Sequence, residues 1–374
     1  MPPRIAIVAP VPVPYREPLF RALAERAAID PRVVYLSGSQ PGWDQPPGWF
    51  AAGEGYPSEL LAARQRSRPG RSPLSVPRGL GAALSRFDPA CVVSWEFGPA
   101  TLRALAWCAR RRRPLVVFSE LTPWSDPELS GRQRRVHRLI APRVAGFLVA
   151  STQGVERLRR LGVDPERVEV ALQAADLERL RAAAAERASE PPVRLLAVGR
   201  LVPDKNLELL LNALHDTGLT AAEVELELRG TGPLEPALRV QANRLELPVL
   251  IPGPAPPAEL PGIYAQADVA LLVSSYEPFG VTMREAAAAG LPLVCSRRAG
   301  AAGDVAVEGE NALLVDPGSR TELSAAVQRI VREPELRARL AAGSRAVTER
   351  HPPEADAEAW ERAVLRALRP RDMR

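Results

Sequence analysis

Short apolar runs alternate along the chain with amphipathic stretches of helical periodicity, in the strand, helix, strand order of parallel α/β units. The first unit has an apolar run at 4–9, a helical stretch at 17–26 and a second apolar run at 32–37. Further apolar runs follow at 90–95, 114–119 and 146–151. We therefore predict five strands in the first half, all in one parallel sheet.

A charged, alanine-rich segment at 176–192 interrupts this alternation. The alternation then resumes, and strands are predicted at 193–199, 224–230, 248–253, 269–275, 292–296 and 312–316. Because 374 residues exceed the usual size of a single core, we predict two Rossmann-like α/β domains, residues 1–175 and 193–352, joined by residues 176–192. Residues 353–374 contain a final helical stretch, which packs either on the second domain or back on the first.

Composition narrows the class of protein. The hydrophobic fraction of 46% and the charged fraction of 25% are ordinary for a globular chain. The three cysteines, Cys91, Cys108 and Cys295, form no CxxC pair, which disfavours disulfides and a structural zinc site and indicates a reducing, cytoplasmic setting. The chain has no apolar run of membrane-spanning length and no signal-peptide pattern. A soluble or peripheral protein is expected.

Positive charge allows several kinds of partner. The formal net charge is +5, which suits nucleic acid, an anionic membrane surface or a phosphate-bearing ligand. Arginine-rich stretches at 64–79, 110–113 and 132–144 either hold a membrane or a lipid-diphosphate acceptor, or form a solvated basic face. Because no nucleic-acid-binding motif is present, no nucleic-acid partner is predicted.

Lysine is almost absent from the chain. Of the 49 basic residues only Lys205 is a lysine, so we expect position 205 to require a compact ammonium group. Ligands of open α/β sheets bind beyond the carboxyl ends of the strands, where helix N-termini offer unpaired N–H groups. Three strand-to-helix turns of the second half carry suitable residues, and we expect these turns to converge on one cleft.

The first two turns are rich in glycine and cations. In the first, Gly199, Arg200 and Lys205 precede an amphipathic helix, and two cations in this place suit a diphosphate. The alternative is that they are solvated loop charges. In the second, Gly230 and Gly232 permit either close approach to a ligand or simply a tight turn.

The third turn has the sequence EPFGVTMRE, in which seven residues separate Glu277 from Glu285. Gly280 permits a tight turn into a helix, and the N–H groups of Gly280, Val281 and Thr282 would face an anion. Glu285 is placed to accept hydrogen bonds from ribose-type hydroxyls, and Glu277 from sugar hydroxyls.

Together these motifs are similar to those of a known family. The set G-R-L-V-P-x-K at 199–205, G-x-G-P at 230–233 and E-P-F-G-x-x-x-x-E-A at 277–286 resembles the retaining nucleotide-sugar glycosyltransferases of family 4. The similarity continues at 309–319 and covers most of residues 193–320. It implies the α/β GT-B fold, in which two Rossmann-like domains face a central cleft.

The resemblance also implies roles for individual residues. Arg200 and Lys205 would bind the donor diphosphate and stabilise the charge of the leaving group, Glu277 would hold the donor sugar, and Glu285 the ribose. The donor-binding set that the resemblance implies consists of Gly199, Gly230, Gly232, Phe279, Gly280, Val281, Thr282 and Glu285. The first domain would bind the acceptor.

The first half departs from the family pattern. Many relatives have glycines in the first strand-to-helix turn, whereas this chain has APVPVPYRE, where Tyr15 and Arg16 contact donor or acceptor instead, or Tyr15 serves packing alone. Many relatives also have a histidine where Glu120 follows the strand at 114–119. Glu120 is either a hydrogen-bond acceptor for donor sugar or acceptor, or a polar loop residue. Glu96 is a weaker candidate of the same kind.

These residues imply a reaction without a metal ion or cofactor. Neither a D-x-D motif nor a histidine–carboxylate cluster follows a strand, so cations would stabilise the charge. The resemblance implies a retaining transfer from a UDP-, GDP- or similar nucleotide sugar to an envelope glycan, a lipid-linked intermediate or a small natural product. The alternatives are another enzyme acting on a sugar nucleotide, such as an epimerase or hydrolase, and a catalytically silent binding protein. The expected location is the cytoplasm, with peripheral contact at the inner membrane face left open.

Overall fold

The computed structural model describes residues 1–40, 49–50, 53–61, 64–68, 71–76, 78–183 and 191–369, and within 64–68 and 71–76 it describes the backbone alone. Residues 1–174 with 353–374 form one compact unit and residues 175–352 form another. Part of the connection expected at 176–192, residues 184–190, lies outside the described residues.

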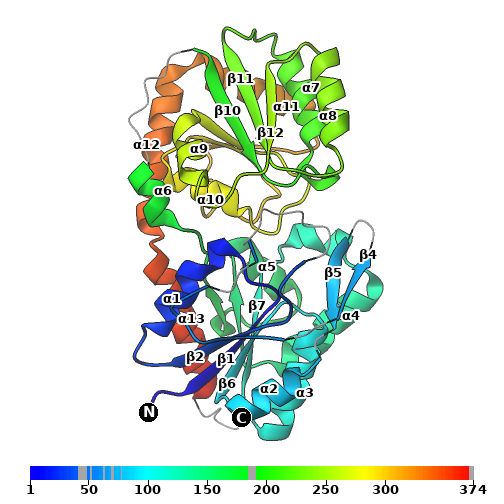
Figure 1. Cartoon of the computed structure of the whole chain (residues 1–374), viewed down its shortest axis with the longest axis vertical. Helices are drawn as coiled ribbons and strands as arrows, with labels where there is room; N and C mark the ends of the chain where they lie inside the picture. Colours follow the sequence, from blue (N-terminus) through cyan, green and yellow to red (C-terminus); the bar gives the residue numbers. More distant parts are fainter. Residues whose placement is uncertain are drawn as a thin grey trace. The chain divides into compact units, whose positions relative to one another are not determined.

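The first unit is built on a seven-stranded parallel sheet with strand order β3-β2-β1-β6-β7-β8-β9 (Figure 1). Its strands are β1 (Arg4–Ala9), β2 (Asp30–Tyr35), β3 (Ser58–Leu60), β6 (Cys91–Trp95), β7 (Leu115–Ser119), β8 (Gly146–Val149) and β9 (Val168–Val170). The five predicted strands are confirmed. The edge strands β3 and β9 were not predicted, because each has three residues and neither forms an apolar run.

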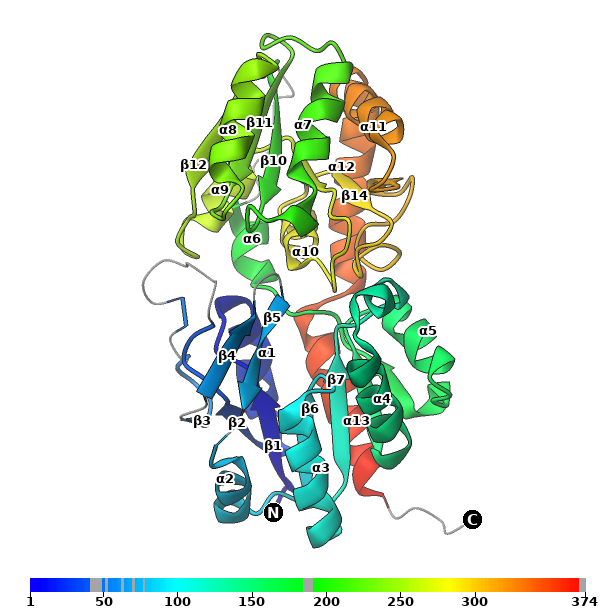
Figure 2. The ribbon, with the colours of Figure 1, turned by 90° about the vertical axis from the view of Figure 1, so that its right-hand side faces the viewer.

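Helices cover both faces of this sheet. α3 (Pro99–Arg111), α4 (Gly131–Ile140) and α5 (Thr152–Arg160) lie in front of the sheet in Figure 2, with α2 (Leu80–Phe87) below, whereas α13 (Pro353–Leu368) lies behind it and contacts α1 (Glu17–Ala24). A hairpin of β4 (Arg64–Arg68) and β5 (Arg71–Val76) is antiparallel and separate from the sheet. The side chains of the arginine-rich stretch at 64–77 lie outside the described residues.

The last helix belongs to the first unit. On α13, Trp360 is 1% exposed, and its ring stacks on Phe118 of β7 with a centroid distance of 5.3 Å. The same ring lies 5.6 Å from the ring of Trp95 at the end of β6. Of the two places expected for this helical stretch, the structure therefore has the one against the first sheet.

The second unit is built on a six-stranded parallel sheet with strand order β12-β11-β10-β13-β14-β15. Its strands are β10 (Val193–Val198), β11 (Val224–Arg229), β12 (Val249–Gly253), β13 (Val269–Leu272), β14 (Leu293–Ser296) and β15 (Ala312–Val315). The helices are α6 (Leu177–Ala183), α7 (Leu207–Asp216), α8 (Glu235–Arg244), α9 (Leu260–Gln266), α10 (Val281–Ala288), α11 (Arg320–Arg332) and α12 (Pro334–Arg350). All six predicted strands are confirmed. Residues 177–183, which we assigned to the connection, instead form α6 and pack on α9 and α10.

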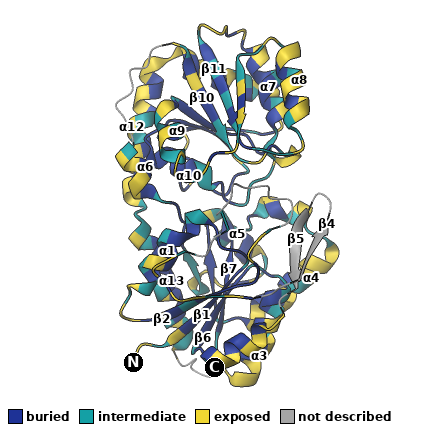
Figure 3. Ribbon diagram, viewed as in Figure 1, coloured by how far each residue is buried: buried dark blue, intermediate teal, exposed yellow. Residues whose placement is uncertain are grey.

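Strand order brings the candidate residues together within each unit. The central strands of the first sheet are buried, as the dark colour of β1, β6 and β7 in Figure 3 shows, because helices cover both faces. In the second sheet β11, β10 and β13 are neighbours, and in the first sheet β1, β6 and β7 are neighbours. Since parallel strands end at the same edge, the loops after these strands lie side by side.

The packing of α13 predicts a large effect of one substitution. We expect Trp360→Ala to lower the free energy of unfolding by about 3–5 kcal/mol, because it removes a buried indole from the sheet. Leu139→Ala is a suitable control, since Leu139 is 46% exposed and the change should stay within about 0.5 kcal/mol. Urea denaturation followed by circular dichroism measures both, and equal effects would show that α13 does not stabilise the first unit.

Candidate functional site

The turns after β10 and β11 pack directly on each other. A Cβ atom on Gly230 would lie 1.8 Å from the carbonyl oxygen of Gly199, and one on Gly232 would lie 2.4 Å from that of Leu201. The N–H group of Leu201 donates to the carbonyl oxygen of Thr231 at 2.9 Å. Both glycines are therefore required by backbone packing, which fixes the first turn against the second.

Lys205 and Glu277 meet at the ends of β10 and β13. Lys205 ends the short helix η5 (Pro203–Lys205), and its ammonium group forms an ion pair with the Glu277 carboxylate, with side chains 17% and 15% exposed. The N–H group of Ser275 donates to the carbonyl oxygen of Asp204 at 2.9 Å and joins the two turns. A pocket opens beside this pair, and Gly199, Arg200 and Lys205 contribute to its lining. The Lys205 ammonium and the Glu277 carboxylate are therefore both partly exposed beside this pocket.

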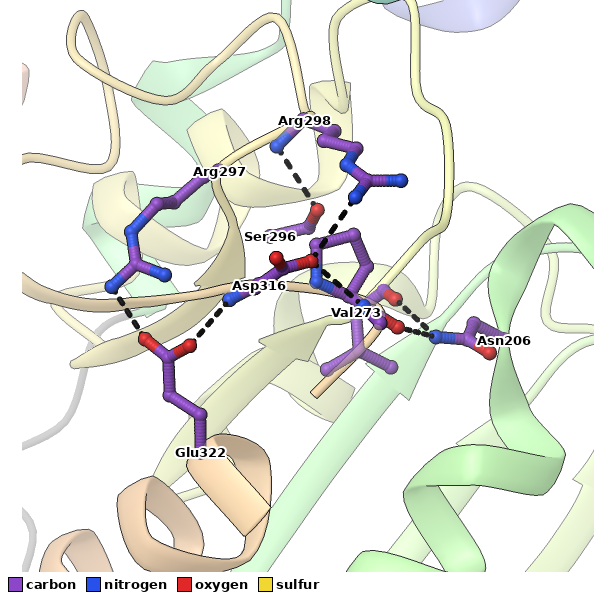
Figure 4. Close-up of polar contacts among 9 residues, drawn as sticks. Asn206, Val273, Ser296, Arg297, Arg298, Asp316 and Glu322 are labelled. Atoms are coloured by element: carbon purple, nitrogen blue, oxygen red, sulfur yellow. Dashed lines mark hydrogen bonds and ion pairs between the residues drawn. The ribbon is translucent and has the colours of Figure 1, made fainter. Parts of the chain in front are cut away.

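Asn206 links the turn after β10 to the loops after β13 and β15 (Figure 4). Its backbone has a φ of 57°, and its amide donates to the carbonyl oxygens of Val273 at 3.2 Å and Pro317 at 2.7 Å. Beside it, the Arg298 guanidinium donates to the Asp316 carboxylate at 3.2 Å. Asn206 was not identified from the sequence. Its position after the single lysine, before a helix, is a signal that could have found it, because asparagine tolerates a left-handed backbone.

The turn after β13 leads into α10 through a left-handed backbone position that favours glycine. Gly280 has a φ of 96°, and a Cβ atom there would lie 2.5 Å from a methyl carbon of Leu272. Among the residues that the structure describes, no side chain caps α10, and Val281 and Thr282 are half-buried in its first turn. Phe279 is only 2% exposed, so its side chain belongs to the core. The uncapped N–H groups of this helix lie near Glu277, whereas the ring of Phe279 is covered.

Glu285 lies deeper, on α10. It is 9% exposed, and its carboxylate accepts a hydrogen bond from the Tyr264 hydroxyl of α9 at 2.7 Å. Burial raises the pKa of Glu285 to about 7, and the bond from Tyr264 opposes this rise. Tyr264 was not identified from the sequence, because nothing local marks a tyrosine of α9 as a partner of α10.

The first unit has its own polar cluster at the carboxyl ends of β6 and β7. Arg16 is 6% exposed, its guanidinium lies 4.5 Å from the ring centroid of Trp95, and it donates to Oε1 of Glu120 at 3.0 Å. The indole N–H of Trp95 donates to the same oxygen at 3.1 Å. Among the described residues, every hydrogen bond that this carboxylate accepts ends on Oε1. Tyr15 is half-buried, with its ring 5.3 Å from the Arg16 guanidinium.

Glu96 holds the backbone of Glu120. One oxygen of its carboxylate accepts from the Glu120 N–H at 2.6 Å, and the other accepts from the Ser119 hydroxyl at 2.9 Å. Glu96 has a φ of 56°, in the left-handed region. Burial, followed by the nearby Glu120 carboxylate, raises the pKa of Glu96 to about 7. The structure therefore brings Arg16, Glu96 and Glu120 together in the first unit, as it brings Lys205 and Glu277 together in the second.

Two general features of the described residues bear on function. No group of three or more histidine, cysteine, aspartate or glutamate side chains in the described ranges is arranged to hold a metal ion. Within the same ranges, no helix is both long and apolar enough to span a membrane.

Two parallel α/β units with polar clusters at their strand ends have the GT-B architecture. The crystal structure of Anabaena HepE in complex with UDP and glucose matches this chain with a TM-score of 0.73 and 19% identity, over 95% of this chain and 97% of that one. A family model described as glycosyl transferases group 1 matches residues 179–347, and one described as a glycosyl transferase 4-like domain matches residues 12–171. The chain belongs to the group 1 glycosyltransferases, and this confirms the group 1 membership and the GT-B fold expected from its motifs.

Curated relatives align with part of the chain. A D-inositol 3-phosphate glycosyltransferase of Rhodococcus jostii is 32% identical over 64% of this chain and 58% of its own length. A glycogen synthase of Mycobacterium tuberculosis is 34% identical over 43% of this chain and 39% of its own length. The chain thus aligns with less than two thirds of the length of each.

The burial of Glu285 predicts a pH-dependent effect on stability. Because its pKa rises from 4.5 to about 7 on folding, the folded chain keeps a proton that the unfolded chain releases, and stability falls as the pH rises through this window. We expect Glu285→Gln to stabilise the ligand-free chain by about 3 kcal/mol at roughly pH 8 and hardly at all at roughly pH 4. Thermal melting at both pH values measures this, and the same effect at both would contradict it.

Proposed function

We propose that this chain transfers a sugar from a nucleotide-diphosphate sugar to an acceptor hydroxyl or similar group, with retention of the anomeric configuration. The observation that carries the proposal is the juxtaposition of Lys205 and Glu277 at the ends of neighbouring strands, beside the uncapped start of α10. A diphosphate needs cations and N–H donors, and a sugar needs hydrogen-bond acceptors. The Lys205 ammonium, the first N–H groups of α10 and the Glu277 carboxylate would supply the cation, the donors and the acceptor.

Donor binding would replace the Lys205–Glu277 ion pair by contacts of each side chain with the donor. In the ligand-free chain the Glu277 carboxylate neutralises the Lys205 ammonium. With a donor bound, Lys205 and Arg200 would contact the diphosphate and stabilise its charge as it leaves, while Glu277 accepts from the sugar hydroxyls. The N–H groups of Gly280, Val281 and Thr282 would add to the phosphate contacts, and no metal ion is needed in this scheme.

Glu285 would bind the ribose of the nucleotide. Tyr264 donates to one oxygen of its carboxylate, Oε2, so the other oxygen can accept from a ribose hydroxyl. Such a hydrogen bond favours the ionised carboxylate, so donor binding would lower the raised pKa of Glu285.

The nucleotide is UDP in this proposal. HepE was crystallised in complex with UDP and glucose, which supports a UDP-sugar for a chain of the same fold. GDP is the alternative, because no described contact of the second unit distinguishes the two bases. The names of the curated relatives, one acting on an inositol phosphate and one on glycogen, support a hydroxyl acceptor without selecting one.

Glu120 would act on the acceptor side. Arg16 and Trp95 hold Oε1 of its carboxylate, while Glu96 holds its backbone, so Oε2 is a fixed acceptor at the strand ends. A carboxylate held in this way can accept the hydrogen bond of an acceptor hydroxyl or of the donor sugar. In the retaining reaction the leaving phosphate would assist deprotonation of the acceptor on the same face.

We place the reaction in the cytoplasm. The thiols of Cys91, Cys108 and Cys295 are all buried and unpaired with one another, which fits a reducing compartment.

Substitutions at the ion pair test the donor site. We expect Lys205→Ala to weaken UDP binding by about 10–100-fold, because a charge-assisted contact to the diphosphate is lost. Lys205→Arg keeps the charge but not the compact ammonium, and we expect it to lose at least about ten-fold, because a larger planar guanidinium replaces the ammonium that meets Glu277. Isothermal titration measures both.

Glu277→Gln tests the role of the carboxylate separately from that of the Lys205 ammonium. It should bind UDP at least as well as the wild type, because Lys205 is no longer neutralised, yet fail to transfer sugar. Wild-type UDP affinity in Lys205→Ala would overturn the diphosphate assignment.

Substitution of Glu120 tests whether its carboxylate acts in sugar transfer and not in UDP binding. We expect Glu120→Ala to keep UDP affinity and to lower transfer from UDP-glucose to simple polyol acceptors by roughly 100-fold, within the range for a positioned acid–base group. Glu128→Ala, on the exposed turn beyond it, should leave both unchanged. Wild-type protein that binds UDP but turns over no donor would instead indicate a silent binding protein, and donor hydrolysis alone would indicate a hydrolase.

A further inference from the structure

Helix α4 of the first unit presents an arginine-rich face to solvent. Arg132, Arg134, Arg135 and Arg138 are exposed, whereas His137 and Ile140 are buried against the unit (Figure 3). At 3.6 residues per turn the four arginines lie on the half of the helix opposite to the two buried side chains. Arg143, just beyond the helix, is exposed as well. These five arginines are called the α4 face below.

The charge of the α4 face is not balanced nearby. The sequence has no acidic residue between Glu128 and Glu156, and none of the five arginines forms an ion pair within the described ranges of the chain. Several other helices of this chain carry paired arginines. Arg159 and Arg160 of α5 pair with Glu156, and arginines of α11, α12 and α13 also have carboxylate partners. A concentrated, unneutralised positive face attracts an anionic surface.

One large exposed apolar side chain lies among the arginines of α4, and a second lies in the helical turn that precedes this helix. Leu139 is 46% exposed and lies between Arg135 and Arg132 around the helix. Trp124 is 44% exposed in the helical turn η2 (Pro123–Glu128). The guanidinium of Arg134 donates to the Asp126 carbonyl oxygen at 3.1 Å, so η2 packs beside the start of α4. Leucine and tryptophan next to arginine are typical of surfaces that enter a lipid headgroup layer.

We propose that the α4 face, with Leu139 and Trp124, docks the protein on an anionic lipid bilayer. Arginines supply attraction to the headgroups, and the two apolar side chains supply shallow insertion, which neither nucleic acid nor an acidic protein segment would use in the same way. The proposed glycosyl transfer does not require this docking, so the two can fail independently.

Vesicle sedimentation of the full chain tests the proposal. The probes are mixed phosphatidylglycerol–phosphatidylcholine vesicles and vesicles of phosphatidylcholine alone, at low and moderate salt. We expect binding to the anionic vesicles only, weakening as salt rises. Replacing Arg132, Arg135 and Arg138 together by Gln should weaken binding by roughly 100-fold, from about five-fold for each arginine.

A matched triple variant controls for net charge and folding. Replacing Arg329, Arg332 and Arg350 of the second unit by Gln removes the same charge, and this variant should bind vesicles like the wild type. Brominated lipids should quench the part of the fluorescence that Trp124→Phe removes. Equal binding by the two triple variants, or no binding of the wild type to anionic vesicles, would overturn the proposal. Binding to a DNA duplex through the same arginines without vesicle binding would overturn it too.

Discussion

The close packing of the turns after β10, β11 and β13 is the constraint on which the candidate donor site depends. Gly230 and Gly232 allow two of these turns to touch along their backbones, and the bond from Ser275 to Asp204 adds the third. This arrangement sets Lys205 against Glu277. A partly buried ion pair contributes little to stability after desolvation, so its place at the sheet edge is better explained by what a ligand can do with each partner. The glycines therefore serve the site through geometry.

Each unit holds a carboxylate at the ends of its strands, but the contacts of that carboxylate differ between the units. In the second unit the cation and carboxylate are paired directly with each other, and both stay partly exposed. In the first unit Glu120 is held by Arg16 and Trp95 on one side and by Glu96 through its backbone on the other. Glu277 can exchange Lys205 for a ligand, whereas Glu120 keeps its partners and offers Oε2, which accepts no hydrogen bond from the described residues. This difference fits a donor that brings its own charge and an acceptor that is neutral at the reacting hydroxyl.

The sequence predicted the parts of this molecule that depend on local patterns. Buried parallel strands form apolar runs, so both sheets could be foreseen, whereas the three-residue edge strands β3 and β9 could not. Lys205 and Glu277 were found because a single lysine and a spaced pair of glutamates are visible in the sequence. The residues that support the site were not found, since Tyr264, which donates to Glu285, and Asn206, which follows Lys205, act through contacts between elements that are distant along the chain. Trp95 was predicted as part of a strand, and only the fold shows that its indole N–H reaches Glu120.

The central claim is that the turns of the second unit bind the nucleotide diphosphate. Hydrogen–deuterium exchange of the full chain with and without UDP tests it most directly, because bound phosphate protects the N–H groups that face it. The account predicts the strongest new protection at residues 199–206, 230–235 and 274–284. Protection that is absent there, or confined to the loops after β6 and β7, would contradict it.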